Sequence, residues 1–352
     1  MSKCAWRVVP LADRLNSREV LAAVSSSLPG NEATRKTEEY WRWKHIDTPF
    51  GWSTGAVALS DPGAAVVGVR SFMRWKLMQP GYEHGGEVLS AVRAVDTVTS
   101  EAWRGKGIFK GLTAAAINDL QRERVDLIFN TPNQNSAPGY LNMGWKCVGS
   151  VALFVRAVRP LRMIYRLLNS QTGASSAWTT QDVQELPLWA NLEDNSEVVA
   201  VVRSHELARR STGLRTPRTP SYLSWRYGAH PQAKYRGFLH RVGGQVIGVA
   251  VVRVNMRLGL RELVLAELWA EGASIRTLSE LLGALCKASD CDYVLAHFSA
   301  GSVEHEAIRR CWFVNVPQRR MRLFSRALGQ PLPCNIFSME AWDLSLGDLE
   351  LF

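Results

Sequence analysis

The feature that most restricts the fold of this chain is an internal repeat, in which a short aromatic motif occurs twice with a constant offset. The residues that recur are Tyr40, Trp43, Lys44 and Pro49, which return as Tyr222, Trp225, Arg226 and Pro231. Three runs rich in β-branched and apolar residues follow each motif and predict strands. They cover residues 55–60, 64–78 and 87–99 in the first half and residues 235–240, 246–256 and 262–269 in the second. The sequence therefore predicts two copies of one α/β unit in tandem.

The correspondence between the two halves continues further along the chain. Asp126-Leu-Ile-Phe corresponds to Asp292-Tyr-Val-Leu, and Gly144-Trp145 corresponds to Cys311-Trp312. Between the halves, residues 170–180 are rich in Ser, Thr, Ala and Gly, a composition that is typical of a linker.

The segment 97–112 has the pattern of a strand that enters an anion-binding turn and then a helix. Arg104-Gly-Lys-Gly107 separates a β-branched run from apolar residues at helical spacing over 108–120. The two glycines allow successive backbone N–H groups to converge, and the helix dipole favours an anion at this end. Arg104, Lys106 and Lys110 add positive charge. The turn therefore suits a pyrophosphate, although a simple strand-to-helix connection would have the same pattern. It matches neither a Walker loop nor a dinucleotide-binding fingerprint.

Residues 125–130 predict a buried strand, and a polar segment ending in Gly144-Trp145 follows it. Together with the upstream turn, this arrangement resembles the GNAT superfamily of N-acetyltransferases. The family signature is Arg/Gln-x-x-Gly-x-Gly/Ala, a helix, a strand, and then Asn-x-x-Ala-x-x-x-Tyr-x-x-x-Gly-Phe. The residues that fall at this spacing are Arg104, Gly107, Asn133, Tyr140, Gly144 and Trp145. Two residues depart from it, since Phe109 stands where Gly or Ala is usual and Ser136 stands for Ala.

The resemblance implies a tandem GNAT fold, an α/β (α+β) protein with two mixed, mostly antiparallel sheets flanked by helices. We expect an acetyl-CoA-binding domain over residues 1–160, a linker over 161–180 and a degenerate second domain over 181–352. For acetyl-CoA as the co-substrate, the resemblance implies these binding residues: Val98, Thr99, Ser100, Arg104, Gly105, Lys106, Gly107, Ile108, Phe109, Asn133 and Ser136. Asn133 could equally cap the following helix. No metal is expected.

Acyl transfer to an amine needs a donor for the leaving thiolate and a group that takes the amine proton. By the resemblance, Tyr140 is the acid, with a packing tyrosine as the alternative. Asp96 is the candidate base, because a carboxylate between apolar residues would have a raised pKa if it were buried. Glu101, His84 and a chain of water molecules are the alternatives.

The aromatic motif of the first half, with Tyr40 and Trp43, has two interpretations. The two rings could form a stacking wall for a sugar substrate. Alternatively, they anchor a short helix to the sheet, which the presence of the motif in both halves favours.

The second half lacks the chemistry of the first. At the position of the basic turn it has Glu267, Glu271 and a single glycine, Gly272. Counting back five residues from Trp312 gives Ala307, so no phenol stands at the position of Tyr140. We therefore expect the second half not to bind CoA.

Composition removes other classes of protein. The net charge is +10, but the 42 Lys and Arg residues are spread along the chain, which disfavours a nucleic-acid-binding tail. The six cysteines form no CxxC pair, so neither a zinc site nor a disulfide framework is indicated. The apolar runs are too short to span a bilayer, and the N-terminus lacks the core of a secretory signal. These features favour the cytoplasm.

The sequence thus predicts an N-acetyltransferase that acts on a small-molecule primary amine by direct transfer from acetyl-CoA. The aromatic motif and the Pro-Asn-x-x-Ser-x-Pro-Gly-Tyr segment are similar to bacterial GNAT proteins of surface-polysaccharide assembly, which implies an amino sugar as acceptor. The alternatives are an aminoglycoside or peptide N-acetyltransferase and a non-catalytic acyl-CoA-binding subunit. Homo-oligomer formation stays open.

Overall fold

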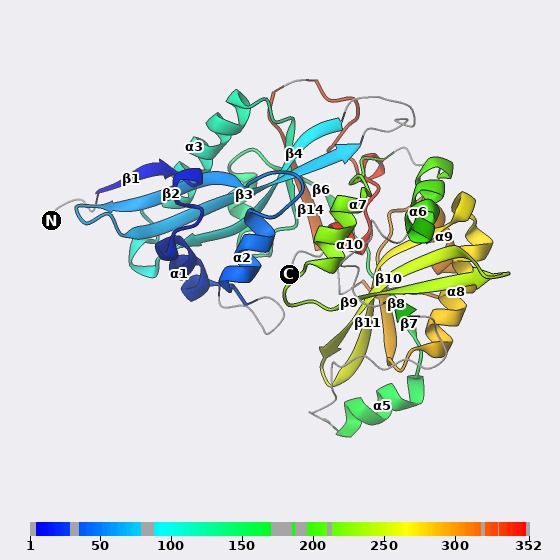
Figure 1. Ribbon diagram of the computed structural model, residues 1–352. Helices are drawn as coiled ribbons and strands as arrows, with labels where there is room; N and C mark the ends of the chain where they lie inside the picture. The colour runs from blue at the N-terminus through cyan, green and yellow to red at the C-terminus, as the bar shows by residue number, and fades with distance from the viewer. Residues whose placement is uncertain are drawn as a thin grey trace.

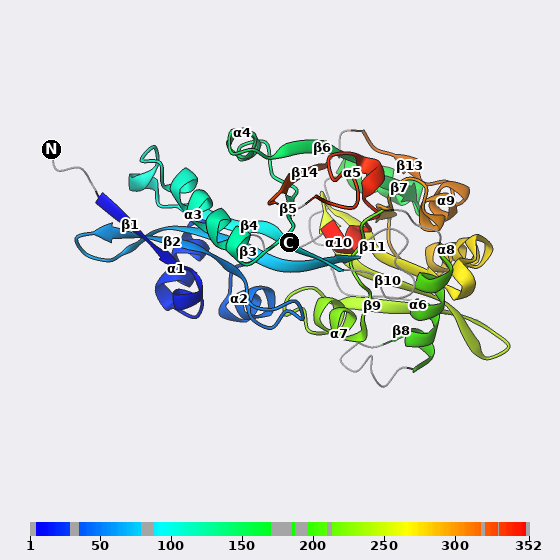
Figure 2. The same cartoon turned by 90° about the horizontal axis from the view of Figure 1, so that it is seen from above.

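The computed structural model describes residues 5–28, 35–78, 88–169, 185–186, 196–209, 213–317, 321–329 and 331–349. In these ranges the strands form two seven-stranded sheets that lie beside each other, each flanked by helices (Figures 1 and 2). The predicted fold class is confirmed. His84 and residues 170–180 of the expected linker lie outside the described residues.

The first sheet has the strand order β1-β2-β3-β4-β5-β14-β6. Its pairs are antiparallel apart from β4 and β5, which run parallel. The strands are β1 (Ala5–Pro10), β2 (Thr54–Asp61), β3 (Val66–Met78), β4 (Val88–Thr99), β5 (Leu127–Asn130), β6 (Lys146–Val151) and β14 (Met321–Ala327).

The second sheet has the order β13-β7-β12-β11-β10-β9-β8, and its one parallel pair is β11 with β12. The strands are β7 (Phe154–Ala157), β8 (Glu185–Leu186), β9 (Tyr235–Val242), β10 (Gln245–Arg257), β11 (Leu260–Ala270), β12 (Tyr293–Ala296) and β13 (Val314–Asn315). The parallel pairs of the two sheets are equivalent. Asp126 accepts a hydrogen bond from the backbone N–H of Ser90, and Asp292 accepts one from that of Arg261.

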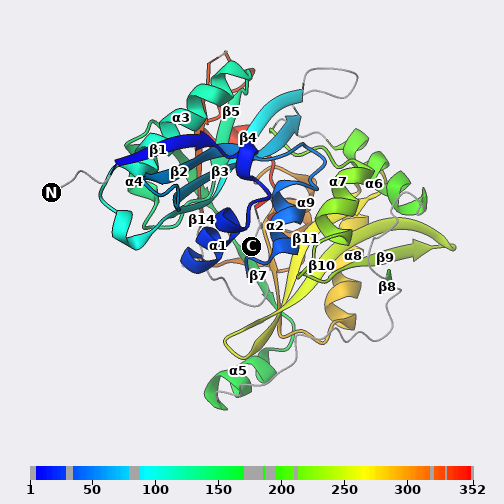
Figure 3. The same cartoon turned by 60° about the vertical axis from the view of Figure 1, so that its left-hand side comes forward.

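The helices cover both faces of each sheet (Figure 3). On the first sheet, α1 (Arg18–Ser27) and α2 (Glu38–His45) pack on one face, while α3 (Ile108–Arg122) and α4 (Ala137–Leu141) pack on the other. The remaining helices are α5 (Pro160–Asn169), α6 (Ser196–Ala208), α7 (Pro220–Leu223), α8 (Ile275–Ala288), α9 (Val303–Arg310) and α10 (Leu346–Leu349). The predicted strands of both halves and the predicted helix over 108–120 agree with these elements.

Each sheet contains one strand from the other half of the chain. Strand β14 lies between β5 and β6, where Phe324 pairs with Asn130 on one side and with Cys147 on the other. In return, β7 lies between β12 and β13 of the second sheet. The division into domains at residues 160 and 180 stays a prediction, but neither sheet is complete within one half. The first residues of the expected linker are helical, since they form α5.

The repeated aromatic motif brings the halves together at a near-symmetric contact. The indole N–H of Trp43 donates to the carbonyl oxygen of Trp225 at 2.8 Å, and the indole N–H of Trp225 donates to that of Trp43, also at 2.8 Å. The two rings stack with centroids 5.0 Å apart. Both side chains are buried in a hydrophobic cluster that includes residues of both halves. The aromatic motif that recurs at an offset of 182 residues therefore joins the two halves of the chain.

One correspondence predicted from sequence is wrong by one residue. Gly144 and Trp312 both have positive φ, 89° and 62°, so these two are equivalent. Trp145 then corresponds to Phe313, which is buried, whereas Trp312 is 83% exposed. The backbone N–H of Phe313 bonds to the carbonyl of Ile308, as that of Trp145 bonds to the carbonyl of Tyr140.

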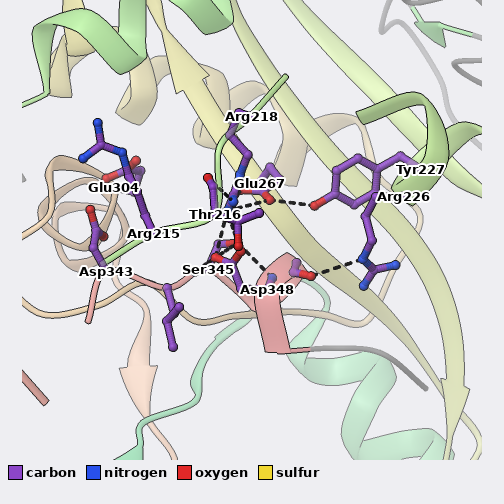
Figure 4. Close-up of polar contacts among 12 residues, drawn as sticks. Arg215, Thr216, Arg218, Arg226, Tyr227, Glu267, Glu304, Asp343, Ser345 and Asp348 are labelled. Carbon is purple, nitrogen blue, oxygen red and sulfur yellow. Dashed lines mark hydrogen bonds and ion pairs between the residues drawn. The ribbon is translucent and has the colours of Figure 1, made fainter. Parts of the chain in front are cut away.

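Buried ion pairs tie the C-terminal segment to the junction of the halves (Figure 4). Arg218 contacts Asp348 at 2.8 Å and Glu267 at 2.9 Å, while Arg209 contacts Asp343 at 2.7 Å. Arg226 donates to the carbonyl oxygen of Gly347. Separating one partner from such a pair would leave an uncompensated buried charge. The ion pairs therefore fix the C-terminal segment in place.

We expect a chain of residues 1–160 not to fold by itself, because β5 and β6 would lose the strand between them. Circular dichroism should show no cooperative thermal transition for this fragment. Co-expression with residues 161–352 should restore one. A monomeric fragment 1–160 with a cooperative transition would contradict the interpretation of the strand exchange.

Candidate functional site

The parallel strands β4 and β5 separate beyond a short paired region. They pair only from Ala91 to Arg93 with residues 127–129, whereas β4 continues along β3 to Thr99. One edge of residues 94–99 therefore bonds to β3, and the other has no strand partner among the described residues. Val98 pairs with Val69, and Ser100 donates its backbone N–H to Val67 at 2.9 Å. The predicted pantetheine-binding residues Val98, Thr99 and Ser100 lie along this opening.

The basic turn leads from β4 to the N-terminus of α3 with its backbone open to solvent. Gly105 and Gly107 have φ of 75° and 76°, and a Cβ atom at either would meet nothing within 4 Å. Gly107 is the N-cap of α3, and no side chain of the described residues caps the helix there. The first N–H groups of α3 therefore point to a free surface between the exposed residues Arg104, Lys106 and Lys110. Ile108 is buried and anchors the first turn.

The corresponding helix of the second half begins differently. The N-cap of α8 is Ser274, whose hydroxyl accepts the backbone N–H of Thr277 at 3.3 Å. Glu271 is exposed, but Glu267 lies within β11 and is buried. Burial raises the pKa of Glu267 to about 7, although Arg218 opposes this rise. The expectation that Glu267 lies in the turn is thus wrong. The residue at the position of Tyr140 is Ile308, so the expected lack of a phenol holds.

Asn133 caps the segment that leads into α4. Its Oδ1 accepts the backbone N–H of Ser136 at 2.9 Å and the hydroxyl of Ser136 at 3.0 Å. This is the capping alternative of the sequence analysis. The contact of either residue with a cofactor stays a prediction.

Tyr140, on α4, is buried and held from several sides. Its ring makes T-shaped contacts with Phe109 and Trp145, with centroids 5.9 and 5.2 Å away. Phe109 also packs over Gly139, where a Cβ would lie 2.9 Å from the Phe109 ring. The departure at position 109 thus fills the space beside α4 rather than the turn.

Arg70, on β3, is a site residue that the sequence analysis missed. Its Nη1 donates to the hydroxyl oxygen of Tyr140 at 2.8 Å and also to Thr97. A guanidinium only donates, so Tyr140 is the acceptor here and its own proton is free to be given elsewhere. Arg70 is fully buried, and its Nε and Nη2 have no hydrogen-bond partner among the described residues. The available signal was an arginine within the apolar run 66–73.

Asp96 occupies a bulge of β4, where two residues oppose Arg70, and its φ is 38°. Its carboxylate is 4% exposed and contacts Lys44 at 2.7 Å, Lys36 at 3.1 Å and His45 at 3.0 Å. Burial by itself would raise the pKa of Asp96, but Lys44, Lys36 and the His45 hydrogen bond outweigh it and hold the pKa well below its usual range. The expected raised pKa is therefore wrong, because the sequence did not show the two lysines converging here.

His45 lies between the Asp96 carboxylate and Ser53. Its Nδ1 lies 2.9 Å from the hydroxyl of Ser53, and its Nε2 faces Asp96. Burial lowers the pKa of His45, with the Asp96 hydrogen bond opposing. All these groups are buried, so they fix α2 against the bulge. The alternative base Glu101 is exposed.

Tyr40 and Trp43 are 1% and 3% exposed, and neither ring presents a face on which a substrate could stack. Burial raises the pKa of Tyr40 to about 12. Their surroundings are those of the aromatic anchor, the second interpretation of the motif.

A half-open pocket of about 430 Å³ lies at the junction of the two halves, away from α3. Met78, Val202 and Leu223 line it, with Arg203 and Arg218 also contributing. Among the helices of the described ranges, none is long and apolar enough to cross a membrane. The same ranges contain no cluster of His, Cys, Asp and Glu that could hold a metal.

No protein-family model matches the sequence, and no curated protein matches it either. Solved structures match the fold. A GCN5-related N-acetyltransferase from Anabaena variabilis has a TM-score of 0.61 at 11% identity, covering 92% of this chain and 73% of that chain. One from Kribbella flavida has a TM-score of 0.56 at 17% identity, covering 92% and 71%. Saccharomyces cerevisiae N-myristoyltransferase with bound myristoyl-CoA has a TM-score of 0.56 at 11% identity, covering 95% and 84%. The chain thus shares the fold of GNAT-type proteins.

The ion pairs of Asp96 predict a specific pH dependence of stability. Because the folded-state pKa lies below the unfolded value, the contribution of Asp96 is present above about pH 4 and is lost as the pH falls through the folded-state pKa. Asp96→Asn should lower the free energy of unfolding at neutral pH by about 3–5 kcal/mol, since Lys44 stays buried without its anion. Urea denaturation below about pH 4 should then show a shallower slope against pH for the variant than for the wild type. Equal slopes would contradict the assignment.

Proposed function

We propose that this chain is an N-acyltransferase that moves an acetyl group from acetyl-CoA to a primary amine by direct transfer. The observation that carries the proposal is the open N-terminus of α3, which follows β4, the strand whose Thr97 accepts from the same arginine as Tyr140. A buried arginine orients the phenol of that tyrosine.

The residues present fit acetyl-CoA. The N–H groups after Gly107 and the side chains of Arg104 and Lys106 suit the pyrophosphate, because an uncapped helix N-terminus binds anions. Residues 98–100 suit the pantetheine arm, since their free backbone edge can bond to it as a strand would. Acetyl-CoA supplies the thioester, whose carbonyl carbon accepts the amine nitrogen.

The chain's own groups manage the protons of this transfer. As the C–N bond forms and the C–S bond breaks, Tyr140 gives its hydroxyl proton to the departing sulfur. The surplus proton of the amine nitrogen passes to water and so to solvent, and solvent returns a proton to the Tyr140 phenolate. Arg70 holds the oxygen of Tyr140 and stabilises the transient phenolate by its charge. We assign Asp96 to holding α2 against the bulge, because its low pKa makes it a weak base.

For the acceptor we propose an amino sugar, used in the cytoplasm for polysaccharide assembly. This rests on the likeness of the two sequence motifs to proteins of that process. A free-thiol release assay with acetyl-CoA and a panel of amino sugars, aminoglycosides and peptides tests it. Release with aminoglycosides or peptides alone would replace the acceptor. CoA binding without release for any amine would instead support the acyl-CoA-binding subunit.

We expect one CoA per chain, bound by the first half. Gly107→Val should abolish CoA binding, because a β-branched residue is strained at this φ and its side chain covers the N–H groups. Isothermal titration calorimetry measures both the stoichiometry of CoA binding and the affinity of each variant for CoA. The matched control is Gly272→Val, at the equivalent turn of the second half with φ of 58°, which should leave CoA affinity unchanged. A stoichiometry of two, or equal affinity for both variants, would refute the assignment.

Tyr140→Phe should lower kcat by about 10²–10⁴-fold while CoA affinity stays nearly constant, since the hydroxyl acts only as the thiolate leaves. Arg70→Met should also lower kcat, with KM for acetyl-CoA unchanged. The thermal stability of the Arg70→Met variant should not fall, because the change removes a buried charge that has no carboxylate partner among the described residues. Full turnover by Tyr140→Phe at saturating substrates would make Tyr140 structural.

A further inference from the structure

Helix α5 is oriented opposite to an ordinary surface helix, because its apolar side faces solvent. Leu161 is 83% exposed, Leu168 is 79% exposed, and Ile164 and Tyr165 are each more than half exposed. The spacing of these four residues places them on one stripe of the helix. None of the ten residues of α5 is buried. A helix with so apolar a stripe normally packs it against the protein.

The polar side of α5 holds it in this orientation. Arg162 contacts Asp292 at 2.6 Å and also pairs with Asp290, and Arg166 contacts the second oxygen of Asp292 at 2.6 Å. The Asp292 carboxylate is fully buried and also accepts the backbone N–H of Arg261. Two charged side chains on a buried carboxylate thus fix the stripe outward, and the exposure is a built feature of the fold.

The apolar surface continues onto the neighbouring hairpin. The turn between β10 and β11 carries Leu258, which is 80% exposed with φ of 52°. Helix α5 packs against β11, and Figures 1 and 3 show this helix and the hairpin turn at the same end of the molecule. Arg257 beside the turn and Arg159 before the helix are both exposed.

We propose that the surface formed by α5 and Leu258 binds the surface of an anionic lipid bilayer, with the apolar stripe inserted among the acyl chains. An exposed stripe of leucine, isoleucine and tyrosine is the apolar side of helices that lie in the membrane interface. Charge complementarity selects the lipid, because Arg159 and Arg257, which are exposed beside the apolar stripe and Leu258, suit lipid phosphates. Because α5 lies at the end of the molecule and presents a convex surface, it suits the flat surface of a bilayer better than it suits a groove on a partner protein. This inference is independent of the proposed acyl transfer.

The test is co-sedimentation of the full chain with vesicles of phosphatidylcholine, with and without phosphatidylglycerol. We expect binding to the anionic vesicles that weakens with added salt. The variant Leu161→Glu/Leu168→Glu should bind at least about tenfold more weakly, since both side chains would be charged at the acyl boundary. The matched control, Val8→Glu/Val242→Glu, changes two exposed apolar residues on β1 and β9 and should bind as the wild type does.

The changed residues are exposed, so both variants should keep the melting temperature of the wild type and any thiol-release activity. No binding of the wild type to anionic vesicles would overturn the proposal, as would equal binding by the α5 variant. A concentration-dependent dimer in sedimentation velocity that the α5 variant alone loses would also overturn it, because the stripe would then be an interface between two copies of this chain.

Discussion

The exchange of strands between the two halves is the constraint on which the rest of the structure depends. Strand β14 completes the first sheet, and it also supports the candidate site directly. Arg326 of β14 donates to the carbonyl of Met143 and lies over the ring of Trp145, with 5.1 Å between the guanidinium and the ring centroid. The segment that positions Tyr140 is therefore built partly by a strand from the other end of the chain. This gives the second half a structural role in a site whose chemistry it lacks.

Charge at the junction of the halves is the second consequence of this arrangement. Arg93, on the last residue pair that joins β4 to β5, donates to the carbonyl oxygen of Asp348 and lies 5.1 Å from the centroids of Trp75 and Phe129. Burial lowers the pKa of Arg93 to about 10, with Asp348 opposing. Buried ion pairs add little net stability compared with apolar packing, but they tolerate few alternative arrangements. The network of Figure 4 thus fixes how the C-terminal segment meets the point where the strands separate.

Local patterns in the sequence predicted the elements of each half well. The β-branched and apolar runs predicted β2, β3 and β4 with their counterparts, since such a run is a local property of the sequence. The turn at Gly105 and Gly107 was also predictable, because glycine adopts at little cost the positive φ that a turn into a helix often needs. The strand exchange was not, since β7 and β14 carry no signal that distinguishes one sheet from the other.

The errors at the site have a common physical origin. The environment of Asp96 depends on Lys36 and Lys44, which are distant in sequence, so burial by itself predicted the wrong direction of its pKa. Arg70 was missed because its function depends on a phenol that lies 70 residues away. The pairing of Trp145 with Trp312 failed because the second half has a tryptophan, Trp312, at the position where the first half has a left-handed glycine, Gly144.

The strand exchange also makes the order of synthesis matter. Strand β6 leaves the ribosome well before β14, and at typical elongation rates its partner follows about 10–35 seconds later. During that time the nascent chain presents open strand edges at β5 and β6, which are sites for mispairing with other chains. Codon choice and chaperone capture between residues 151 and 321 therefore bear on the yield of this protein.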